Sequence, residues 1–180
     1  VVNAVPDDVR METFVRGSSI NAIRNANEKV DRALRAGALA VGATVEITTL
    51  PGYLPLAPDE NLTALHRANA EALVGSDRVH EFGRRGGSTD MGDLTQLMPG
   101  IHPYVGGAVG RSNHAEDMVV DDYNLAVLDA GKAMAMTVVD LLSNGASEGM
   151  RVISEHRPAM TKDEYLILQR AFLSERSYTE

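Results

Sequence analysis

The N-terminal part of this chain alternates between two hydrophobic periods, and this alternation constrains the fold more than any other feature. Apolar and polar residues alternate along residues 8–16, which predicts a half-buried strand. Apolar positions then recur every three or four residues in a segment that Ser18 or Ser19 caps and that ends no later than Gly42. Residues 44–50 alternate again. The chain therefore opens with a predicted strand–helix–strand unit.

A proline-rich stretch separates this unit from the rest of the chain. Residues 51–58 contain three prolines, which favours an extended connector and predicts a domain boundary. The later patterns predict a helix from 59 to about 74, a strand at 79–82, a short helix at 90–98, a strand at 101–105, a well-buried helix at 124–143, and, past a polar link, an amphipathic helix from 162 to about 174. This mixture of helices and strands indicates the α/β class.

Charge and composition exclude several classes of function. The 180 residues include 25 acidic and 17 basic side chains, and the net charge of −8 repels phosphate backbones, so no nucleic-acid partner is expected. The absence of cysteine excludes disulfides, thiolate metal sites and a cysteine nucleophile. No apolar run approaches the roughly 18 residues that span a bilayer, which predicts a cytoplasmic protein without a membrane partner. Because the first residue is Val1 rather than Met, we expect a piece of a longer protein.

The histidines are the first candidates for metal binding. There are five, at positions 66, 80, 102, 114 and 156, and no two lie three or four residues apart on one predicted helix. The chain therefore has no self-contained helical zinc motif. His114 stands out because it lies in a polar loop after the glycine-rich residues 106–110, and loops of this kind often hold functional sites. A solvated loop histidine is the alternative interpretation, and the other four are expected at the surface, at the core edge or in simple packing.

The sequence Gly-Gly-Ser-Thr-Asp at 86–90 is a second candidate site. It places backbone N–H groups at the start of a predicted helix, where a carboxylate or phosphate can bind. A helix cap made by Ser88, Thr89 or Asp90 is the structural alternative. The turn lacks the final glycine of a serine-hydrolase elbow, and the chain has no phosphate-binding loop of the Gly-x-x-x-x-Gly-Lys type. The glycines at 106–110 lack the acidic residue that would complete a dinucleotide site.

Several short motifs in a fixed order resemble those of zinc-dependent amidohydrolases. They are Asn-Ala-Val-Pro-Asp at 3–7, Arg16, Gly-Gly-Ser-Thr-Asp-Met-Gly-Asp at 86–93, Pro99 and His114. Over residues 1 to about 143, their order and spacing resemble the C-terminal half of the family of aminoacylases, glutamate carboxypeptidases and succinyl-diaminopimelate desuccinylases. The form of the Ser-Thr-Asp motif is most similar to the branch that contains p-aminobenzoyl-glutamate hydrolase and hippurate-type amidohydrolases.

The resemblance implies a domain organisation. In that family a lid domain of two strand–helix–strand halves is inserted into an α/β catalytic domain, and the lid also forms the dimer. By this comparison, residues 1–52 are the second half of the lid and residues 53–145 are the C-terminal part of the catalytic domain. Residues 146–180 form a helical extension outside the resemblance. A homodimer through the lid is expected on the same basis.

The resemblance also implies roles for individual residues. Asn3 and Arg16 would bind the carboxylate or amide oxygen of the substrate, a task that suits the planar fork of arginine. Gly87, Ser88 and Thr89 would shape the substrate pocket. His114 would be the last protein ligand of a site for two divalent metals, with zinc expected and manganese or cobalt as alternatives. The usual His-Ser-Pro of the family reads His-Ala-Glu at 114–116 in this chain.

The other metal ligands and the glutamate general base of this family lie in its N-terminal half, which has no counterpart here. Because the general base is absent, no catalytic residue is expected in this chain. One histidine cannot hold a catalytic zinc, so the chain is expected to be inactive without that half as a partner. The sequence thus predicts the C-terminal portion of a metal-dependent amidohydrolase that cleaves N-acyl or N-aroyl amino acids or short peptides. A non-catalytic dimerisation or binding fragment, and an unrelated α/β domain that binds a small anion, are the alternatives.

Overall fold

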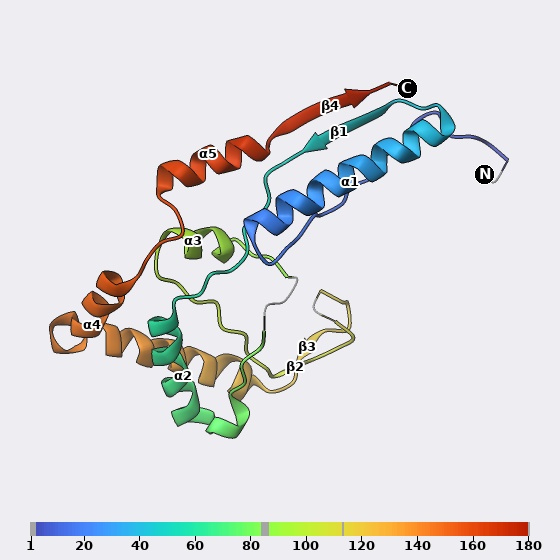
Figure 1. Cartoon of the computed structure of the whole chain (residues 1–180). Coiled ribbons are helices and arrows are strands. Elements are labelled where there is room, and N and C mark those ends of the chain that lie inside the picture. Colours follow the sequence, from blue (N-terminus) through green and yellow to red (C-terminus); the bar gives the residue numbers. More distant parts are fainter. Residues whose placement is uncertain (1–2, 84–86, 113, 180) are drawn as a thin grey trace.

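A computed structural model describes residues 3–83, 87–112 and 114–179 of the chain. One group of elements lies together along one side of the molecule (Figure 1): helix α1 (Ile20–Val41), strand β1 (Val45–Thr49), helix α5 (Lys162–Phe172) and strand β4 (Ser174–Tyr178). The remaining elements are the helices α2 (Glu60–Val74), η1 (Ser76–Arg78), α3 (Met91–Leu97), η2 (Asn124–Asp129) and α4 (Ala130–Glu155), and the short strands β2 (Ala108–Val109) and β3 (Val119–Val120). The mixture of helices and strands confirms the α/β class.

Local sequence sets both ends of α1. The side chain of Ser19 accepts a hydrogen bond from the backbone N–H of Ala22 at 3.2 Å, so Ser19 is the cap of the two serines that the sequence offered. Gly42 ends the helix with a left-handed φ of 65°, a conformation that glycine adopts without strain. The predicted helix and the limit that Gly42 sets for its end are therefore confirmed, and the strand expected after it is β1.

Strand β1 pairs with β4, which the sequence patterns did not predict. The two strands are antiparallel, with Val45 opposite Tyr178 and Thr49 opposite Ser174. A strand needs a hydrogen-bonded neighbour to persist. Residues beyond 145, which the family resemblance does not cover, thus supply the partner of a strand from the N-terminal unit.

Helix α1 lies beside this strand pair and contacts the C-terminal segment through cation–π pairs. The guanidinium carbon of Arg35 lies 4.1 Å from the ring centroid of Tyr178, and that of Arg24 lies 5.7 Å from the ring of Phe172. These contacts add to the β1–β4 ladder. They hold α1 against both α5 and β4.

A side-chain contact between Asp59 and His156 joins the start of α2 to the end of α4. Asp59 caps α2 by accepting a hydrogen bond from the N–H of Leu62 at 2.9 Å. Its other oxygen lies 2.7 Å from Nδ1 of His156, the residue that ends α4. Both side chains are nearly buried, so the pair fixes two helix ends that lie 97 residues apart in the sequence.

Three predicted strands are absent from the part of the chain that the structure describes. Residues 8–16, 79–82 and 101–105 form no regular strand, although the first of these segments is long and alternating. The reason is the lack of partners, because β1 takes β4 as its neighbour and β2 pairs only with β3. Alternation shows that a segment suits a strand, but a ladder needs a second strand as well.

The long helix predicted at 124–143 exists, but its surroundings differ from the prediction. It opens as the π-helix η2 and continues into α4, where residues 143–146 break the helical geometry. The chain then resumes a helix up to Glu155, where a polar link was expected. The prediction of a well-buried helix is wrong, because only Ala133, Thr137 and Val152 of α4 are buried. Helix α2 covers one side of α4 and leaves the other uncovered.

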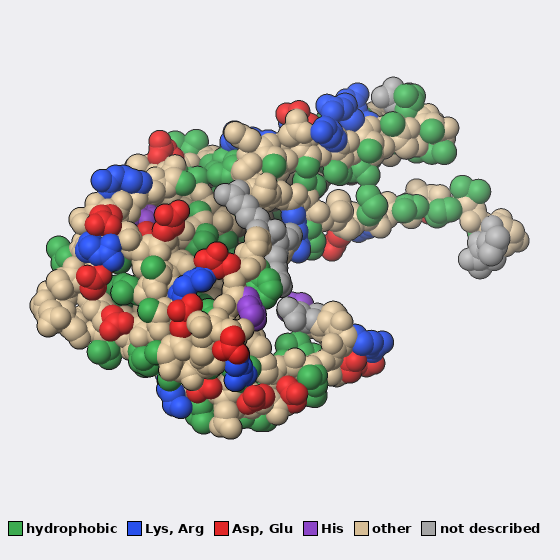
Figure 2. Space-filling view, turned by 60° about the horizontal axis from the view of Figure 1, so that its bottom comes forward, with side chains coloured by type: hydrophobic (Ala, Val, Ile, Leu, Met, Phe, Trp, Pro, Cys, Tyr) green, Lys and Arg blue, Asp and Glu red, His purple; other side chains and the backbone are tan. Residues whose placement is uncertain are grey.

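The described residues bury few apolar side chains. The buried apolar residues among them are Ile47, Leu54, Ala133 and Val152, whereas many large apolar side chains on α1, α4 and the loops are exposed. Figure 2 shows apolar side chains reaching the surface between charged groups over much of one face. Within the described ranges, no helix is long and apolar enough to cross a membrane.

Candidate functional site

Helix α3 and the turn before it, which carry the Ser-Thr-Asp-Met-Gly-Asp motif, anchor the proline-rich connector. Three side chains of α3 bond to the connector backbone: Asp93 accepts from Leu54 N–H at 3.0 Å, Thr95 accepts from Ala57 N–H at 3.0 Å, and Gln96 donates to the carbonyl of Pro55 at 2.6 Å. The carbonyl of Gln96 also accepts from Ala159 N–H at 3.0 Å. The motif therefore holds the boundary between the predicted domains and a segment of the C-terminal extension at the same place.

Gly92 allows this close contact. A Cβ atom at this position would lie 1.8 Å from the carbonyl oxygen of Leu54, far inside any real contact distance. Leu54 itself is one of the most buried side chains of the described residues, at 2% exposure. The glycine of the motif is thus required by packing between helix and connector. The sequence offered one signal for it, a glycine inside a predicted helix.

Two carboxylates, those of Asp90 and Asp93, lie at the N-terminal end of α3. Asp90 Oδ1 accepts a hydrogen bond from the N–H of Met91 at 2.9 Å, so the predicted alternative of a helix cap is confirmed. Burial raises the pKa of Asp93 above its ordinary value, the hydrogen bond from Leu54 opposes this, and the charge of Asp90 raises the pKa further. Two acidic groups at one short helix start disfavour a bound phosphate or carboxylate there.

The other predicted residues of this turn lie at its surface. Gly87 and Ser88 are exposed, and Thr89 is half-buried with its hydroxyl donating to Asp90 Oδ1 at 2.9 Å. A Cβ atom at Gly87 would lie 4.0 Å from the hydroxyl of Tyr104. Gly86, which opens the sequence motif, lies outside the described residues. The turn therefore presents an accessible edge next to an aromatic side chain.

His114 lies at the tip of the β2–β3 hairpin. It is exposed and has a left-handed φ of 70°, a conformation that is uncommon outside glycine. The base of the tip is held by Arg111, whose Nε lies 3.0 Å from Asp117 Oδ2, and by a hydrogen bond of 3.2 Å from Ala115 N–H to the carbonyl of Ser112. His114 is therefore accessible from solvent at the tip of the hairpin.

Asn3 and Arg16 lie in the N-terminal segment that precedes α1. Both are exposed, and the guanidinium carbon of Arg16 lies 5.3 Å from the ring centroid of Phe14. The described part of this segment runs along α1, away from the β2–β3 hairpin that carries residue 114 (Figure 1).

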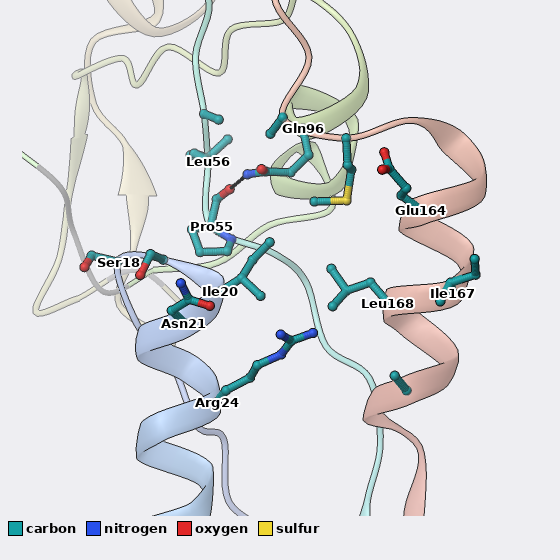
Figure 3. Close-up of a pocket in the computed structure, with 15 residues that line it drawn as sticks. Ser18, Ile20, Asn21, Arg24, Pro55, Leu56, Gln96, Glu164, Ile167 and Leu168 are labelled. Carbon is teal, nitrogen blue, oxygen red and sulfur yellow. Dashed lines mark hydrogen bonds between the residues drawn. The ribbon is translucent and has the colours of Figure 1, made fainter.

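A cleft with a volume of about 690 Å³ lies between α1 and α5. Its wall is formed by the start of α1, the connector, α3 and α5, and Figure 3 shows Arg24 pointing into the space between the two helices. Apolar side chains such as Ile20 and Leu168 form most of the remaining wall. None of the six predicted site residues (Asn3, Arg16, Gly87, Ser88, Thr89, His114) lines this cleft.

The described residues contain no group of three or more His, Asp or Glu side chains that could hold a metal ion. His114, the predicted ligand, therefore belongs to no such group among them. A metal site that uses His114 therefore needs ligands from outside the described part of this chain.

A buried polar cluster between α2 and α4 was not predicted. Asn69 donates to Asp140 Oδ2 at 2.7 Å and to the hydroxyl of Thr137 at 3.3 Å. His66 lies 3.4 Å from the same hydroxyl, and burial lowers its pKa. His66 was expected at the surface or the core edge, and its half-buried position agrees. The cluster fixes how the two helices pack.

Comparison with known proteins supports the motif resemblance. The chain is 30% identical over 159 residues to "Xaa-Arg dipeptidase" of Mus musculus, which covers 83% of this chain and 36% of that protein. It is 29% identical over 148 residues to the Homo sapiens protein of the same name, covering 78% of this chain and 34% of that protein. At this coarse level, the chain is related to dipeptidases. No family model matches the chain, and no solved structure matches it.

The similarity to these two proteins supports, at a general level, the assignment of the chain to peptidases or amidohydrolases. The chain spans about a third of the length of these curated relatives. The assignment to the p-aminobenzoyl-glutamate and hippurate-type branch stays a prediction, as do the roles of the six site residues.

Proposed function

We propose that this chain is the C-terminal portion of a metal-dependent amidohydrolase that cleaves the amide bond of a dipeptide or an N-acyl amino acid. The observation that carries the proposal is the similarity to the two dipeptidases over most of this chain. Their printed name suggests a substrate with a C-terminal arginine. The net charge of −8 suits a cationic substrate of that kind.

In the proposed enzyme this chain supplies substrate contacts and one metal ligand. Arg16 and Asn3 bind the substrate carboxylate or amide oxygen, the accessible edge at Gly87–Thr89 forms part of the pocket, and His114 is the ligand. The described residues do not form a zinc site on their own. The remaining ligands and the general base come from the part of the relatives that has no counterpart here, so the chain alone is inactive. A homodimer in the cytoplasm belongs to the same proposal.

The alternative is a non-catalytic dimerisation or anion-binding fragment. The anion-binding form has less support at residues 86–90, because Asp90 and Asp93 occupy the start of α3. A dimerisation fragment would have every contact described above. It would differ from the proposed amidohydrolase only because it binds no metal and catalyses no reaction.

Zinc content separates these two functions. The 180-residue chain is purified alone and after co-expression with the part of mouse Xaa-Arg dipeptidase that lies outside the match, and zinc and Xaa-Arg hydrolysis are measured. We expect zinc and activity only in the co-expressed complex, with both lost in His114→Ala. His80→Ala is the control, because His80 is also exposed and lies in irregular backbone. The proposal would be contradicted if the complex formed by His114→Ala contains as much zinc as the complex formed by the unchanged chain.

A further inference from the structure

The cleft between α1 and α5 lies where the N-terminal unit meets the C-terminal segment. Its wall combines the first turns of α1, the connector at residues 55–57, part of α3 and one side of α5 (Figure 3). Its volume of about 690 Å³ falls within the range of about 300–1,000 Å³ that is usual for small-molecule sites. None of the six predicted site residues lines it, so the cleft is separate from the residues of the proposed enzyme.

Most of the cleft wall is aliphatic. Ile20 on α1 and Leu168 on α5 point into the space between the two helices (Figure 3), and Leu56 of the connector and Met160 before α5 extend the same surface. All four side chains are half-buried, so an apolar group in the cleft removes more of their surface from water. No lining residue is aromatic among those that the structure describes, which favours an aliphatic group over one that needs a ring to stack on.

Two polar side chains of the wall are already bonded within the fold. Gln96 donates to the carbonyl of Pro55 at 2.6 Å, a bond that Figure 3 shows. Glu164 Oε2 accepts from the N–H of Thr161 at 2.7 Å and from its hydroxyl at 2.9 Å, which completes the capping box of α5. These hydrogen bonds lower the pKa of Glu164. The carboxylate of Glu164 therefore serves the start of α5.

Arg24 is the basic residue of the wall, and its charge has no carboxylate partner within the described part of the chain. Its guanidinium points into the space between α1 and α5 (Figure 3), with its carbon 5.7 Å from the ring centroid of Phe172. The planar fork of a guanidinium suits the two oxygens of a carboxylate. One cation in an aliphatic wall matches a ligand with one negative charge and an apolar tail. A polyphosphate would need several cations.

We infer that this cleft binds an aliphatic monocarboxylate. Arg24 takes the carboxylate in charge-assisted hydrogen bonds, and the alkyl chain lies between Ile20 and Leu168. Because the ligand contacts both α1 and α5, it stabilises the packing of the N-terminal unit on the C-terminal segment by mass action. The site needs neither a metal nor another chain, so it stands or falls independently of the proposed function.

Isothermal titration calorimetry of the 180-residue chain with sodium octanoate and sodium decanoate tests the inference. We expect decanoate to bind with a Kd below about 1 mM. A fully buried methylene group raises affinity about fourfold, and the cleft is open on one side, so the two extra methylenes of decanoate should strengthen binding at least fourfold over octanoate. Decyltrimethylammonium, which has the same tail and the opposite charge, should bind at least tenfold more weakly than decanoate.

Variants of α1 locate the binding site. Arg24→Gln should weaken decanoate binding about tenfold, because it removes the charge-assisted bonds. Arg24→Lys, which keeps the charge without the planar fork, should bind with intermediate affinity. Arg32→Gln is the matched control, because Arg32 is an exposed arginine of the same helix that does not line the cleft. Leu168→Ala should reduce the gain in affinity from octanoate to decanoate. Circular dichroism checks that each variant keeps its helices.

Four results would overturn the inference. They are a Kd for decanoate above 1 mM, equal affinity for decanoate and decyltrimethylammonium, equal affinity of Arg24→Gln and Arg32→Gln for decanoate, and a dimer that Leu168→Ala dissociates in the absence of ligand. The last result, measured by sedimentation equilibrium, would mean that a second copy of the chain occupies the cleft.

Discussion

Replacement of Gly92 by alanine tests whether the close contact between α3 and the connector holds the described fold together. The added methyl group would lie 1.8 Å from the carbonyl oxygen of Leu54, so helix and connector must separate by more than about 1 Å to restore a normal contact. Overpacking of this kind costs about 1–3 kcal/mol. The separation also stretches the bonds from Asp93 and Gln96 to the connector, at about 1 kcal/mol each.

Alanine returns about 1 kcal/mol through its better helix propensity. We therefore expect Gly92→Ala to lower the free energy of unfolding by about 2–4 kcal/mol. The measurement is urea unfolding followed by far-ultraviolet circular dichroism.

Gly131 provides a matched control, because it is also helical and a Cβ atom there would meet nothing within 4 Å. Gly131→Ala should raise the free energy of unfolding by about 0.5–1 kcal/mol, through backbone entropy alone. The two substitutions are chemically identical and differ only in their surroundings. If Gly92→Ala is neutral or stabilising to the same degree as Gly131→Ala, the packing of α3 on the connector is wrong.

Two further predictions concern acidic residues with opposite pKa shifts. Burial alone would raise the pKa of Asp59, but hydrogen bonds from Leu62 N–H and His156 together with the His156 charge outweigh it, so the pKa is lowered below 3.8. Its stabilisation is therefore full above pH 3.8 and lost as the pH falls through the lowered value. Asp59→Asn should remove this dependence of stability on pH and lower the free energy of unfolding at neutral pH by about 1–2 kcal/mol in urea titrations. Asp121 is exposed, so Asp121→Asn should change neither the pH dependence nor the stability at neutral pH. The pKa of Asp93 is raised, so its charge lowers stability as the pH rises above 3.8. Asp93→Asn keeps an acceptor for Leu54 N–H, so at pH 7 its free energy of unfolding should equal or exceed that of the unchanged chain. Asp93→Leu, which lacks this acceptor, should be less stable. A large loss of stability in Asp93→Asn would show that the charge itself is needed.

The sequence predicted the helices better than the strands, and the reason is the range of the interactions involved. The signals for α1 are all local: Ser19 at its start, Gly42 at its end and a regular apolar period between them. The capping residue of α2, Asp59, was equally local. Strand β4 depends on β1, which lies more than 120 residues earlier, and no local pattern of residues 174–178 indicates that pairing.

The candidate site was predicted in part. The motif at 86–93 contains the helix cap that the residues themselves suggested, but the strongest contacts of α3, from Asp93, Thr95 and Gln96 to the connector, were not predicted because they join segments about 40 residues apart. The roles of Asn3, Arg16 and His114 come from the family resemblance alone. The described residues do not collect them into the cleft between α1 and α5, so these roles stay predictions.

The burial of α4 could not be predicted for a different reason. Its composition is apolar enough for a core helix, and periodicity shows which side chains share a face but not what covers that face. In this structure the covered face is the polar one, because Asn69 and His66 on α2 offer partners to Thr137 and Asp140 that water would otherwise supply. Burying the polar side is favourable only where such partners exist. The apolar side needs no specific partner, only removal from water, so any apolar surface of the right length can cover it. The polar cluster therefore sets the orientation of α4 and leaves the apolar side of the helix exposed among the described residues.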